Sequence, residues 1–568
     1  MSGDALRGIG VGVASIVGQV RRFDSQILVP DDEKVPCGSA EVEKALEFVR
    51  FCLERVREEL EAQANAQGDQ VVADVVIANA EIVADPELAK RIENLVREGN
   101  GPAGAVNKAF AECEELFDSL GGYMAERKSD LRSLRDRVLA KILGKPDPVV
   151  ELEEPRILVA KDLTPADTVS LDLSNVLAVV TQEGGSTSHT AIIARQNGIP
   201  CVVGVASADK LTDGALVAVE SAKGLVTLAP DEKLVEHIRR EKQFRRSLAS
   251  DRRLGATKDG RRVELLANIG GKKDANRAVE LGAEGVGLFR TEFLFLGADL
   301  EPTVSEQEAA YSAVFERFRG KKVVLRTLDA GSDKPLSFAN NTDEPNPALG
   351  VRGYRLAKSN QELLLNQLVA VNQAAARNPE TDVWVMAPMV STEKESADFA
   401  RLVRNLESDI KVGVMVEVPS AALCAYSILS TVDFVSLGTN DLAQYVMASD
   451  RQLASLADLL SPWQPAVLQL VSKTVLAAKA AGKPVGVCGE AASDPLLALF
   501  LVGLGASSLS MSAASIAEVR FALRNMTRSE CADLAHSVLL AGNANEARAC
   551  ALEMTSPEAL KVLGLNSK

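Results

Sequence analysis

The sequence predicts a multidomain α/β protein whose C-terminal half is a (β/α)8 barrel. The chain has 568 residues, which is too many for one hydrophobic core. Hydrophobic residues make up 46% and charged residues 25%, as in ordinary globular proteins. After Gly260, eight short apolar runs alternate with helical patterns, which is typical of this barrel. We expect barrel strands at residues 263–268, 285–290, 322–327, 382–389, 411–418, 433–438, 484–488 and 507–511.

The N-terminal half shows two other patterns. A short run rich in glycine and β-branched residues, at 9–17, predicts a strand, and strand-like runs return after Pro155. Apolar residues between these segments recur every three or four positions, which predicts a helical bundle. We therefore expect an α/β domain from residues 1–20 and 145–230, interrupted by a helical subdomain at 21–144. A charged helical linker at 231–260 would then lead to the barrel domain at 261–568.

Charge and composition exclude several classes of protein. The formal net charge of −15 disfavours non-specific binding to nucleic acid. No stretch of about 18 apolar residues is present, so we expect no membrane insertion. The N-terminus lacks the features of a secretory signal peptide. The eight cysteines are scattered without a Cys-x-x-Cys pair, which favours reduced thiols and a cytoplasmic location.

Charged residues follow several of the predicted barrel strands. The basic ones are Arg290, Arg326, Lys334 and Arg451. Guanidinium groups bind phosphate and carboxylate oxygens in pairs, and a single arginine at a strand end could equally form a salt bridge. Several cations on one rim of an acidic protein favour an anion site instead. Glu417 and Asp441 offer the one or two carboxylates that Mg²⁺ takes beside substrate oxygens and water.

Cys488 lies at the end of the seventh predicted strand. A free cysteine is most often a small buried apolar residue. Its position at a strand end, followed by Gly489-Glu490, favours a role in acid–base chemistry.

His189 is the predicted nucleophile. It follows Gly184-Gly185 and three hydroxyl residues, and the pattern after it predicts a helix. The free N–H groups and the dipole of a helix N-terminus favour a phosphoryl group and keep an imidazole neutral. We therefore expect His189 to carry a phosphoryl group. His237 and His536 lie in charged or helical stretches and are expected to be structural.

Six motifs together resemble the enzyme I family of the bacterial phosphotransferase system, the phosphoenolpyruvate–protein phosphotransferases. The resemblance covers the chain from Gly8 through the eighth barrel run. The motifs are Gly-Gly-x-Thr-Ser-His-Thr at 184–190, Phe-Arg-Thr-Glu-Phe at 289–293, Arg-Thr-Leu-Asp-Ala-Gly-x-Asp-Lys at 326–334, Asn-Pro-Ala-Leu-Gly-Val-Arg at 346–352, Gly-Thr-Asn-Asp-Leu-x-Gln-Tyr at 438–445 and Val-Cys-Gly-Glu at 487–490.

The resemblance implies that His189 takes a phosphoryl group from phosphoenolpyruvate and passes it to a histidine of the carrier protein HPr. The small α/β domain would swivel to carry that group. Cys488 would protonate the enolpyruvate to give pyruvate, Glu417 and Asp441 would bind Mg²⁺, and Thr168 would support the phosphohistidine. The residues implied to bind phosphoenolpyruvate are Arg290, Arg326, Lys334, Arg352, Asn440, Asp441 and Arg451. The helical subdomain would dock HPr, and the barrel domain would form a homodimer.

The sequence departs from the family pattern at four places: Ser332, Gln452-Leu453, Trp463-Gln464-Pro465 and Gly12-Val13-Ala14. None of them removes a group with an implied chemical role. Two other functions are alternatives to phosphotransfer to HPr. An ATP-linked dikinase that uses phosphoenolpyruvate would need a nucleotide-binding domain, and the first 140 or so residues contain no Gly-rich phosphate loop. A non-catalytic phosphoenolpyruvate sensor would not need His189 and Cys488.

Overall fold

The computed structural model forms two compact units, Met1–Lys242 and Gln243–Lys568. Its described residues are 5–12, 15–23, 27, 29, 39–65, 70–120, 128–145, 152, 154–163, 167, 175–185, 188, 190–191, 193–194, 199–295, 298, 300–331, 336, 338–339, 344, 346–450, 454–563 and 565. No helix among these residues is long and apolar enough to cross a lipid bilayer.

The first unit contains an eight-stranded sheet in the order β1-β8-β7-β3-β4-β5-β6-β2. Strands β3, β4, β5 and β6 run parallel, and the remaining pairs are antiparallel. The N-terminal strands thus share a sheet with strands that follow residue 155, which confirms the predicted insertion of the helical segment. The strands are β1 (Ala5–Arg7), β2 (Ile9–Val11), β3 (Ser15–Phe23), β4 (Arg156–Ala160), β5 (Val176–Thr181), β6 (Cys201–Val203), β7 (Leu216–Glu220) and β8 (Leu225–Leu228).

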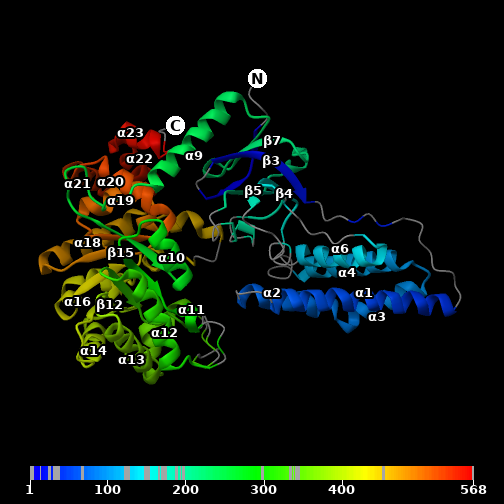
Figure 1. Ribbon diagram of the computed structural model, residues 1–568, viewed down its shortest axis with the longest axis horizontal. Helices are drawn as coiled ribbons and strands as arrows, with labels where there is room; N and C mark the ends of the chain where they lie inside the picture. The colour runs from blue at the N-terminus through cyan, green and yellow to red at the C-terminus, as the bar shows by residue number, and fades with distance from the viewer. Residues whose placement is uncertain are drawn as a thin grey trace. The chain divides into compact units, whose positions relative to one another are not determined.

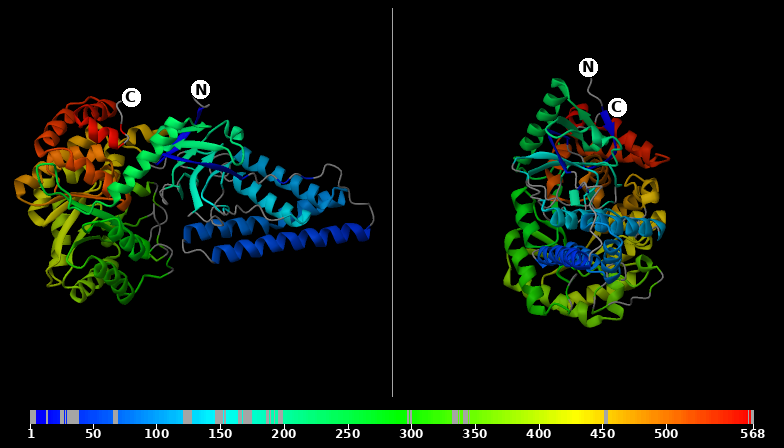
Figure 2. Two further views of the ribbon diagram at one scale, coloured as in Figure 1. Left: turned by 45° about the horizontal axis from the view of Figure 1, so that its top comes forward. Right: turned by 90° about the vertical axis from the view of Figure 1, so that its right-hand side faces the viewer.

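Within the described residues, the inserted bundle comprises five helices (Figures 1 and 2). They are α1 (Ser39–Asn65), α2 (Gln70–Val83), α3 (Pro86–Arg97), α4 (Pro102–Leu120) and α6 (Lys128–Leu143). Their apolar stripes meet in a core in which Leu60, Val96 and Phe110 are fully buried. Asp167 ties the α/β part to this bundle. Its carboxylate accepts a hydrogen bond from Ser133 of α6 at 3.1 Å and pairs with Arg137 at 3.7 Å.

Eight parallel strands close into a barrel in the second unit (Figure 1). The strands are β9 (Glu264–Ile269), β10 (Val286–Arg290), β11 (Lys322–Arg326), β12 (Asp382–Ala387), β13 (Lys411–Val416), β14 (Phe434–Leu437), β15 (Val485–Val487) and β16 (Ser508–Met511). Each lies within or overlaps one of the eight runs expected from the sequence, so the predicted (β/α)8 fold is confirmed. Apolar outer faces of these strands pack on the surrounding helices in one continuous core.

Helices follow the barrel strands and cover them. The α-helices are α10 (Lys272–Glu280), α11 (Glu292–Phe295), α12 (Val304–Phe315), α13 (Gln361–Arg377), α14 (Glu393–Arg404), α15 (Pro419–Leu423), α16 (Ala425–Thr431), α17 (Thr439–Met447), α18 (Pro465–Ala481), α19 (Pro495–Leu504), α20 (Ile516–Arg524), α21 (Arg528–Leu539), α22 (Ala544–Met554) and α23 (Pro557–Val562). Capping boxes begin α12, α14 and α21. In each, the hydroxyl of a threonine N-cap accepts the backbone N–H of a glutamate three residues later, and that glutamate side chain accepts the threonine N–H.

The charged linker is mostly one helix, α9 (Glu232–Ala249). Its C-terminal part is attached to the barrel unit, because Phe244 packs edge-on against Phe521 of α20 with ring centroids 5.5 Å apart. Arg520 then donates to the carbonyl oxygens of Asp251 at 2.7 Å and Gly282 at 2.8 Å. The C-terminal part of α9, from Phe244 on, therefore belongs to the barrel unit.

Candidate active site

The carboxyl ends of the barrel strands bring Arg290, Arg326, Glu417 and Asp441 to one rim. Arg290 ends β10 and Arg326 ends β11, and the two are direct partners in the parallel register. Strands of a parallel barrel all present their carboxyl ends to the same face, where loops can add further groups. Among the described residues, Arg290 has no carboxylate partner, whereas Arg326 is buried and ion-paired.

Two carboxylates hold Arg326. Its Nη1 lies 2.9 Å from Asp329 Oδ2, and its Nη2 donates to Glu292 of α11. Burial alone disfavours the charged guanidinium, but the charges of Asp329 and Glu292 outweigh it and raise the pKa of Arg326. Arg326 is therefore a permanent cation at this rim. The sequence interpretation that favoured an anion ligand over a salt bridge is incomplete, since Arg326 has ion-pair partners before any ligand binds.

Asp329 also holds Arg352, which lies beside Arg326. Nε and Nη2 of Arg352 donate to the two oxygens of Asp329, both at 3.0 Å, and Nη1 donates to Asp441 Oδ1 at 3.0 Å. An antiparallel backbone bridge to Gly331 holds the loop that carries Arg352. The close approach of the two segments requires glycine, because a Cβ at Gly331 would lie 2.8 Å from the Val351 carbonyl oxygen. Burial opposes the charge of Arg352, and Asp329 overcomes it and raises its pKa.

Glu417, directly after β13, is fully buried with one oxygen unpaired. Its Oε1 accepts the Met389 N–H at 2.7 Å, and its Oε2 has no hydrogen-bond partner among the described residues. Met389 reaches it from a left-handed conformation (φ 56°), which is strained for a side chain of this size. Burial raises the pKa of Glu417, as do the charges of Asp441 and Asp329. A buried carboxylate with a free oxygen beside a second carboxylate fits a hard divalent cation.

Cys488 lies at the same rim, two strands further along the barrel than Glu417. It follows β15 and is 3% exposed, and its thiol donates to the Leu437 carbonyl oxygen at 3.4 Å. Burial raises the pKa of Cys488 to about 11, against the opposing effect of a hydrogen bond from the Ser436 hydroxyl. The side chain is thus a neutral thiol that holds a proton at physiological pH. Asn440 lies at this rim as well, and its Oδ1 accepts the Glu490 N–H at 2.9 Å.

A buried network of hydrogen bonds from α12 and α13 holds the carboxyl ends of β10 and β11. Gln367 of α13 donates to Thr291 Oγ1 at 3.0 Å and to the Tyr311 hydroxyl at 3.1 Å, and it accepts the Leu328 N–H at 2.9 Å. Thr291 in turn donates to the Arg326 carbonyl oxygen at 2.9 Å. Gln367 thereby fixes the backbone next to Arg290 and Arg326, two of the residues predicted to bind the substrate.

Four predicted site residues lie outside the described residues: Thr168, His189, Lys334 and Arg451. The described neighbours of His189 in the sequence support the expected helix start. Thr190 and Ala191 are helical, and the Ala191 N–H donates to the Ser188 hydroxyl at 3.4 Å, as in an N-cap. Thr190 also donates to the Leu163 carbonyl oxygen at 3.2 Å, so this helix start is held to Leu163.

Sequence reasoning missed the residues that balance and support the site. Glu292 and Asp329 both lie within the motifs named above, and Asp329 is three positions after Arg326. Neither was predicted to take part in the site. Their signal was that each carboxylate lies directly beyond a strand end with an arginine. Gln367 gave no signal, because a glutamine within a helix is ordinary until its burial is known.

The chain matches three families of phosphoenolpyruvate-utilising enzymes along its length. These are the N-terminal domain at residues 4–127, the mobile domain at 152–224 and the phosphoenolpyruvate-binding domain at 245–528. It is 46% identical to a phosphoenolpyruvate-protein phosphotransferase of Streptomyces coelicolor, across 97% of this chain and 99% of that one. It is 38% identical to that of Staphylococcus carnosus (91% and 93% covered) and 36% identical to that of Bacillus subtilis (94% and 96%). The chain belongs to the phosphoenolpyruvate-protein phosphotransferase family.

Proposed function

We propose that this enzyme transfers the phosphoryl group of phosphoenolpyruvate to its own His189 and then to a histidine of HPr, releasing pyruvate. This would be the first general step of sugar uptake by the phosphotransferase system. The observation that carries the proposal is the barrel rim, where permanent cations, a buried acidic pair and a protonated thiol meet. Phosphoryl transfer needs mainly positioning and neutralisation of charge, and this set of groups supplies both.

The barrel rim is the proposed binding site for phosphoenolpyruvate. Arg290 lacks a carboxylate partner in the described part of the chain, so it is the group best placed to take an anionic oxygen without losing an ion pair. Arg326 and Arg352 stay charged and offset the buried carboxylates Glu292, Asp329 and Asp441 with which they pair. Asn440, Asp441, Lys334 and Arg451 complete the proposed set by their place in the family motifs.

Glu417 and Asp441 are the proposed ligands of Mg²⁺. Glu417 Oε2, which has no hydrogen-bond partner among the described residues, can bind a cation. Gly438 leaves the space beside this oxygen open, because a Cβ there would lie 2.9 Å from it. No group of three or more metal-ligating side chains occurs among the described residues. Mg²⁺ commonly uses one or two carboxylates with substrate oxygens and water. When bound, the ion would neutralise charge on the transferring phosphoryl group.

Cys488 is the proposed proton donor to the enolpyruvate carbon, and Thr168 the proposed support of the phosphohistidine. A thiol whose pKa is about 11 is protonated before the reaction and can give its proton to a carbanion-like enolate. The link from Thr190 to Leu163 supports the assignment of Thr168, since it joins a residue next to His189 in the sequence to one five positions before Thr168.

The helical subdomain is the proposed docking surface for HPr. Several large apolar side chains of the bundle face solvent: Phe48, Phe51, Ile77 and Leu116. Exposed apolar groups on one subdomain are typical of a protein-binding surface. The proposed domain division remains the one expected from the sequence, with this bundle inserted into the phosphohistidine domain.

The barrel domain is the proposed homodimer interface. Helices α15, α16 and α18 pack against one another and expose Leu423, Tyr426 and Leu476 at 55%, 64% and 59%. We also propose a cytoplasmic location, because the described cysteines are unpaired thiols.

The test of phosphotransfer uses the purified chain with Mg²⁺ and phosphoenolpyruvate labelled in its phosphoryl group. The wild type should gain an acid-labile, alkali-stable label and pass it to HPr, while His189→Ala should gain none. Absence of label on the wild type, or equal labelling of the alanine variant, would refute the proposal. Labelling that requires ATP would instead indicate a dikinase, and binding of phosphoenolpyruvate without label would indicate a sensor.

A further inference from the structure

Met389, two residues after β12, has a strained backbone beside the candidate metal site. Its φ is 56°, in the left-handed region that bulky side chains rarely adopt. Of the four residues other than glycine with a positive φ in the described part of the chain, Met389 alone is buried. Such strain persists only where the surroundings enforce it, and it concentrates at functional sites. We therefore asked what the conformation of Met389 provides.

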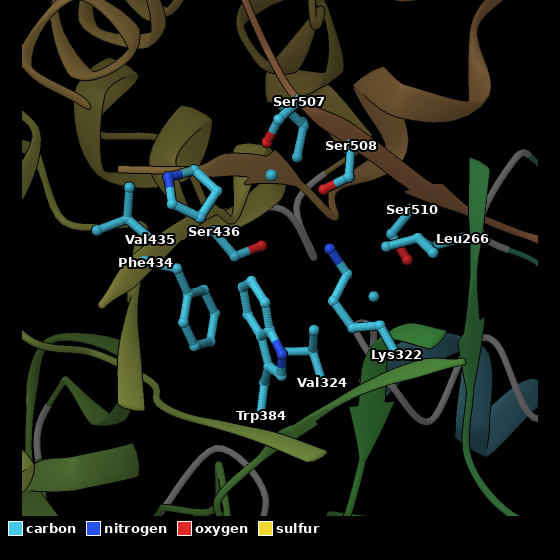
Figure 3. Close-up of a pocket in the computed structure, with 14 residues that line it drawn as sticks. Leu266, Lys322, Val324, Trp384, Phe434, Val435, Ser436, Ser507, Ser508 and Ser510 are labelled. Atoms are coloured by element: carbon cyan, nitrogen blue, oxygen red, sulfur yellow. The ribbon is translucent and has the colours of Figure 1, made fainter. Parts of the chain in front are cut away.

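Packing at both ends of β12 enforces this conformation. Near the amino end, the ring of Trp384 lies against that of Phe434 inside the barrel, with centroids 4.7 Å apart (Figure 3). Beyond the carboxyl end, Gly353 lies so close that a Cβ on it would be 3.0 Å from Met389 Cγ. The strand is thus held in place and cannot shift to relieve the strain at Met389.

The segment after Met389 is held as well. The Ser391 hydroxyl accepts Nη2 of Arg355 at 3.0 Å, and the Ser391 carbonyl oxygen accepts the Ser420 hydroxyl at 3.0 Å. The Ser391 N–H donates to Glu395 at 2.8 Å. Arg355 lies three residues after a candidate-site arginine, and Ser420 lies three residues after the candidate metal ligand. Hydrogen bonds from both neighbouring segments therefore fix the backbone that follows Met389.

This conformation directs the Met389 N–H at Glu417. The N–H donates to Glu417 Oε1 at 2.7 Å, and Glu417 is fully buried. Its Oε2 has no hydrogen-bond partner among the described residues, and Gly438 leaves space beside that oxygen. The backbone therefore occupies one oxygen of the carboxylate and leaves the other for a cation.

Divalent cations differ in what they need from a carboxylate. Mg²⁺ demands near-ideal octahedral geometry with oxygens at about 2.0–2.1 Å. Ca²⁺ accepts about 6–8 oxygens at about 2.3–2.6 Å, and it often takes both oxygens of one carboxylate. A carboxylate that offers one fixed oxygen suits Mg²⁺, whereas a carboxylate free to turn and chelate suits Ca²⁺.

We propose that Met389 determines the metal specificity of the candidate site through its backbone N–H, which restricts Glu417 to one oxygen and so favours Mg²⁺ over Ca²⁺. The inference rests on the proposed function, in which Glu417 is a metal ligand. Met389 is a positioning residue, because it acts through Glu417. The left-handed backbone aims the N–H, which accounts for strain at a buried position.

The test deletes this hydrogen bond and keeps the side chain. Suppression of a stop codon in the full-length chain can replace Met389 with its α-hydroxy analogue, in which an ester oxygen stands in place of the N–H. Isothermal titration should then show a Kd for Mg²⁺ raised about 10- to 100-fold, as is usual when a metal ligand loses its supporting partner. The Kd for Ca²⁺ should change by less than about threefold, because Ca²⁺ can use both oxygens. An unchanged ratio of the two Kd values would overturn the proposal.

Two matched variants separate this effect from general damage to the loop. The same ester at Ser391 deletes the N–H bond to Glu395, and both Kd values should stay as in wild type. Met389→Leu keeps the N–H and a side chain of similar volume, so the preference for Mg²⁺ should persist. A loss of preference in either control equal to that in the Met389 ester would overturn the proposal.

A measurement on the wild type does not depend on the folding of any variant. Infrared difference spectra on addition of Mg²⁺ should show the wide separation of carboxylate bands that accompanies binding through one oxygen. The narrow separation of two-oxygen chelation would overturn the proposal. Glu417→Gln tests the proposed function separately. If this variant binds Mg²⁺ as tightly as wild type, the metal site lies elsewhere and the inference fails with it. If binding depends on Glu417 but the Met389 ester keeps the ion ratio, the inference alone fails.

Discussion

Arg352 grips Asp329 with two parallel hydrogen bonds, Nε to Oδ1 and Nη2 to Oδ2, each 3.0 Å long, and both side chains are fully buried. The same carboxylate lies 2.9 Å from Arg326. One carboxylate is therefore shared by two guanidinium groups, which also pair with Glu292 and Asp441. Bidentate pairing of this kind fixes the plane of the arginine as well as its charge. Asp329 is thus the central counterion of the rim.

Replacing Asp329 with alanine should destabilise the barrel strongly. Two buried arginines would lose their shared partner, and breaking a buried ion pair by removing one side costs about 3–5 kcal/mol. Thermal unfolding followed by calorimetry should show a clear fall in the transition of the barrel unit. Asp398→Ala, which breaks exposed pairs with Lys394 and Arg401, is the control and should leave that transition unchanged. Equal melting of the two variants would contradict the assigned role of Asp329.

Glu417→Gln should abolish measurable Mg²⁺ binding while the chain stays folded. The amide keeps the shape of the side chain and can still accept the Met389 N–H, but it removes the negative charge beside Gly438. Isothermal titration of the metal alone, with circular dichroism as a folding control, measures this directly. Glu393→Gln on the exposed start of α14 should bind Mg²⁺ as wild type does. Unchanged binding by Glu417→Gln would place the metal elsewhere.

The barrel could be predicted from the sequence because each strand is a short apolar run followed by a helical pattern. Residues at strand ends, such as Arg290, Glu417 and Cys488, could be grouped on one rim for the same reason. The partners of those residues could not. Whether Arg326 faces a ligand or Glu292 depends on packing between α11 and β11, and no local pattern encodes that contact.

The interior of the barrel was equally hidden from the sequence. Ser436, Gly486 and Ser508 become neighbours only through the register of three strands that lie up to 70 or so residues apart in the chain. Each is unremarkable in its own segment. The strained Met389 is similar, because neither its left-handed backbone nor the hydrogen bond from its N–H to Glu417 is signalled by the local sequence.

Cys488 should react with iodoacetamide only slowly in the native protein at neutral pH. Burial keeps the reactive thiolate scarce, since the pKa of Cys488 is about 11. The raised pKa also means that folding favours the neutral thiol. This contribution to stability is complete below the pKa of the unfolded thiol and declines as the pH rises towards about 11. Mass spectrometry across pH 7–10 should find a low, rising rate for Cys488 and full labelling after unfolding. Rapid labelling at pH 7 would contradict the burial.

Charge placed on the apolar face of α15, α16 and α18 should prevent dimerisation. Tyr426→Glu and Leu476→Glu put a carboxylate among exposed apolar side chains, and burying an unpaired charge in an interface is costly. Sedimentation velocity should then show a monomer where the wild type is a dimer, and Cys424 beside this face should be alkylated faster in the variants. Leu300→Glu, 78% exposed and between α11 and α12 in the chain, serves as the control. A wild type that is already monomeric would refute the proposed interface.

Gln367→Leu should impair the reaction without touching the substrate. Leucine has a similar volume but cannot pair the Leu328 N–H or the Thr291 hydroxyl, and leaving such buried groups unpaired costs about 1–3 kcal/mol each. Because Thr291 holds the Arg326 backbone, the strand ends that carry Arg290 and Arg326 should lose their fixed geometry. We expect kcat/KM for phosphoenolpyruvate to fall by about 10- to 100-fold, mostly through KM, as binding groups become misplaced. Tyr311→Phe removes only the outer hydroxyl of the network and should lower kcat/KM less. If kcat/KM falls equally in Tyr311→Phe and Gln367→Leu, the whole network acts through stability alone.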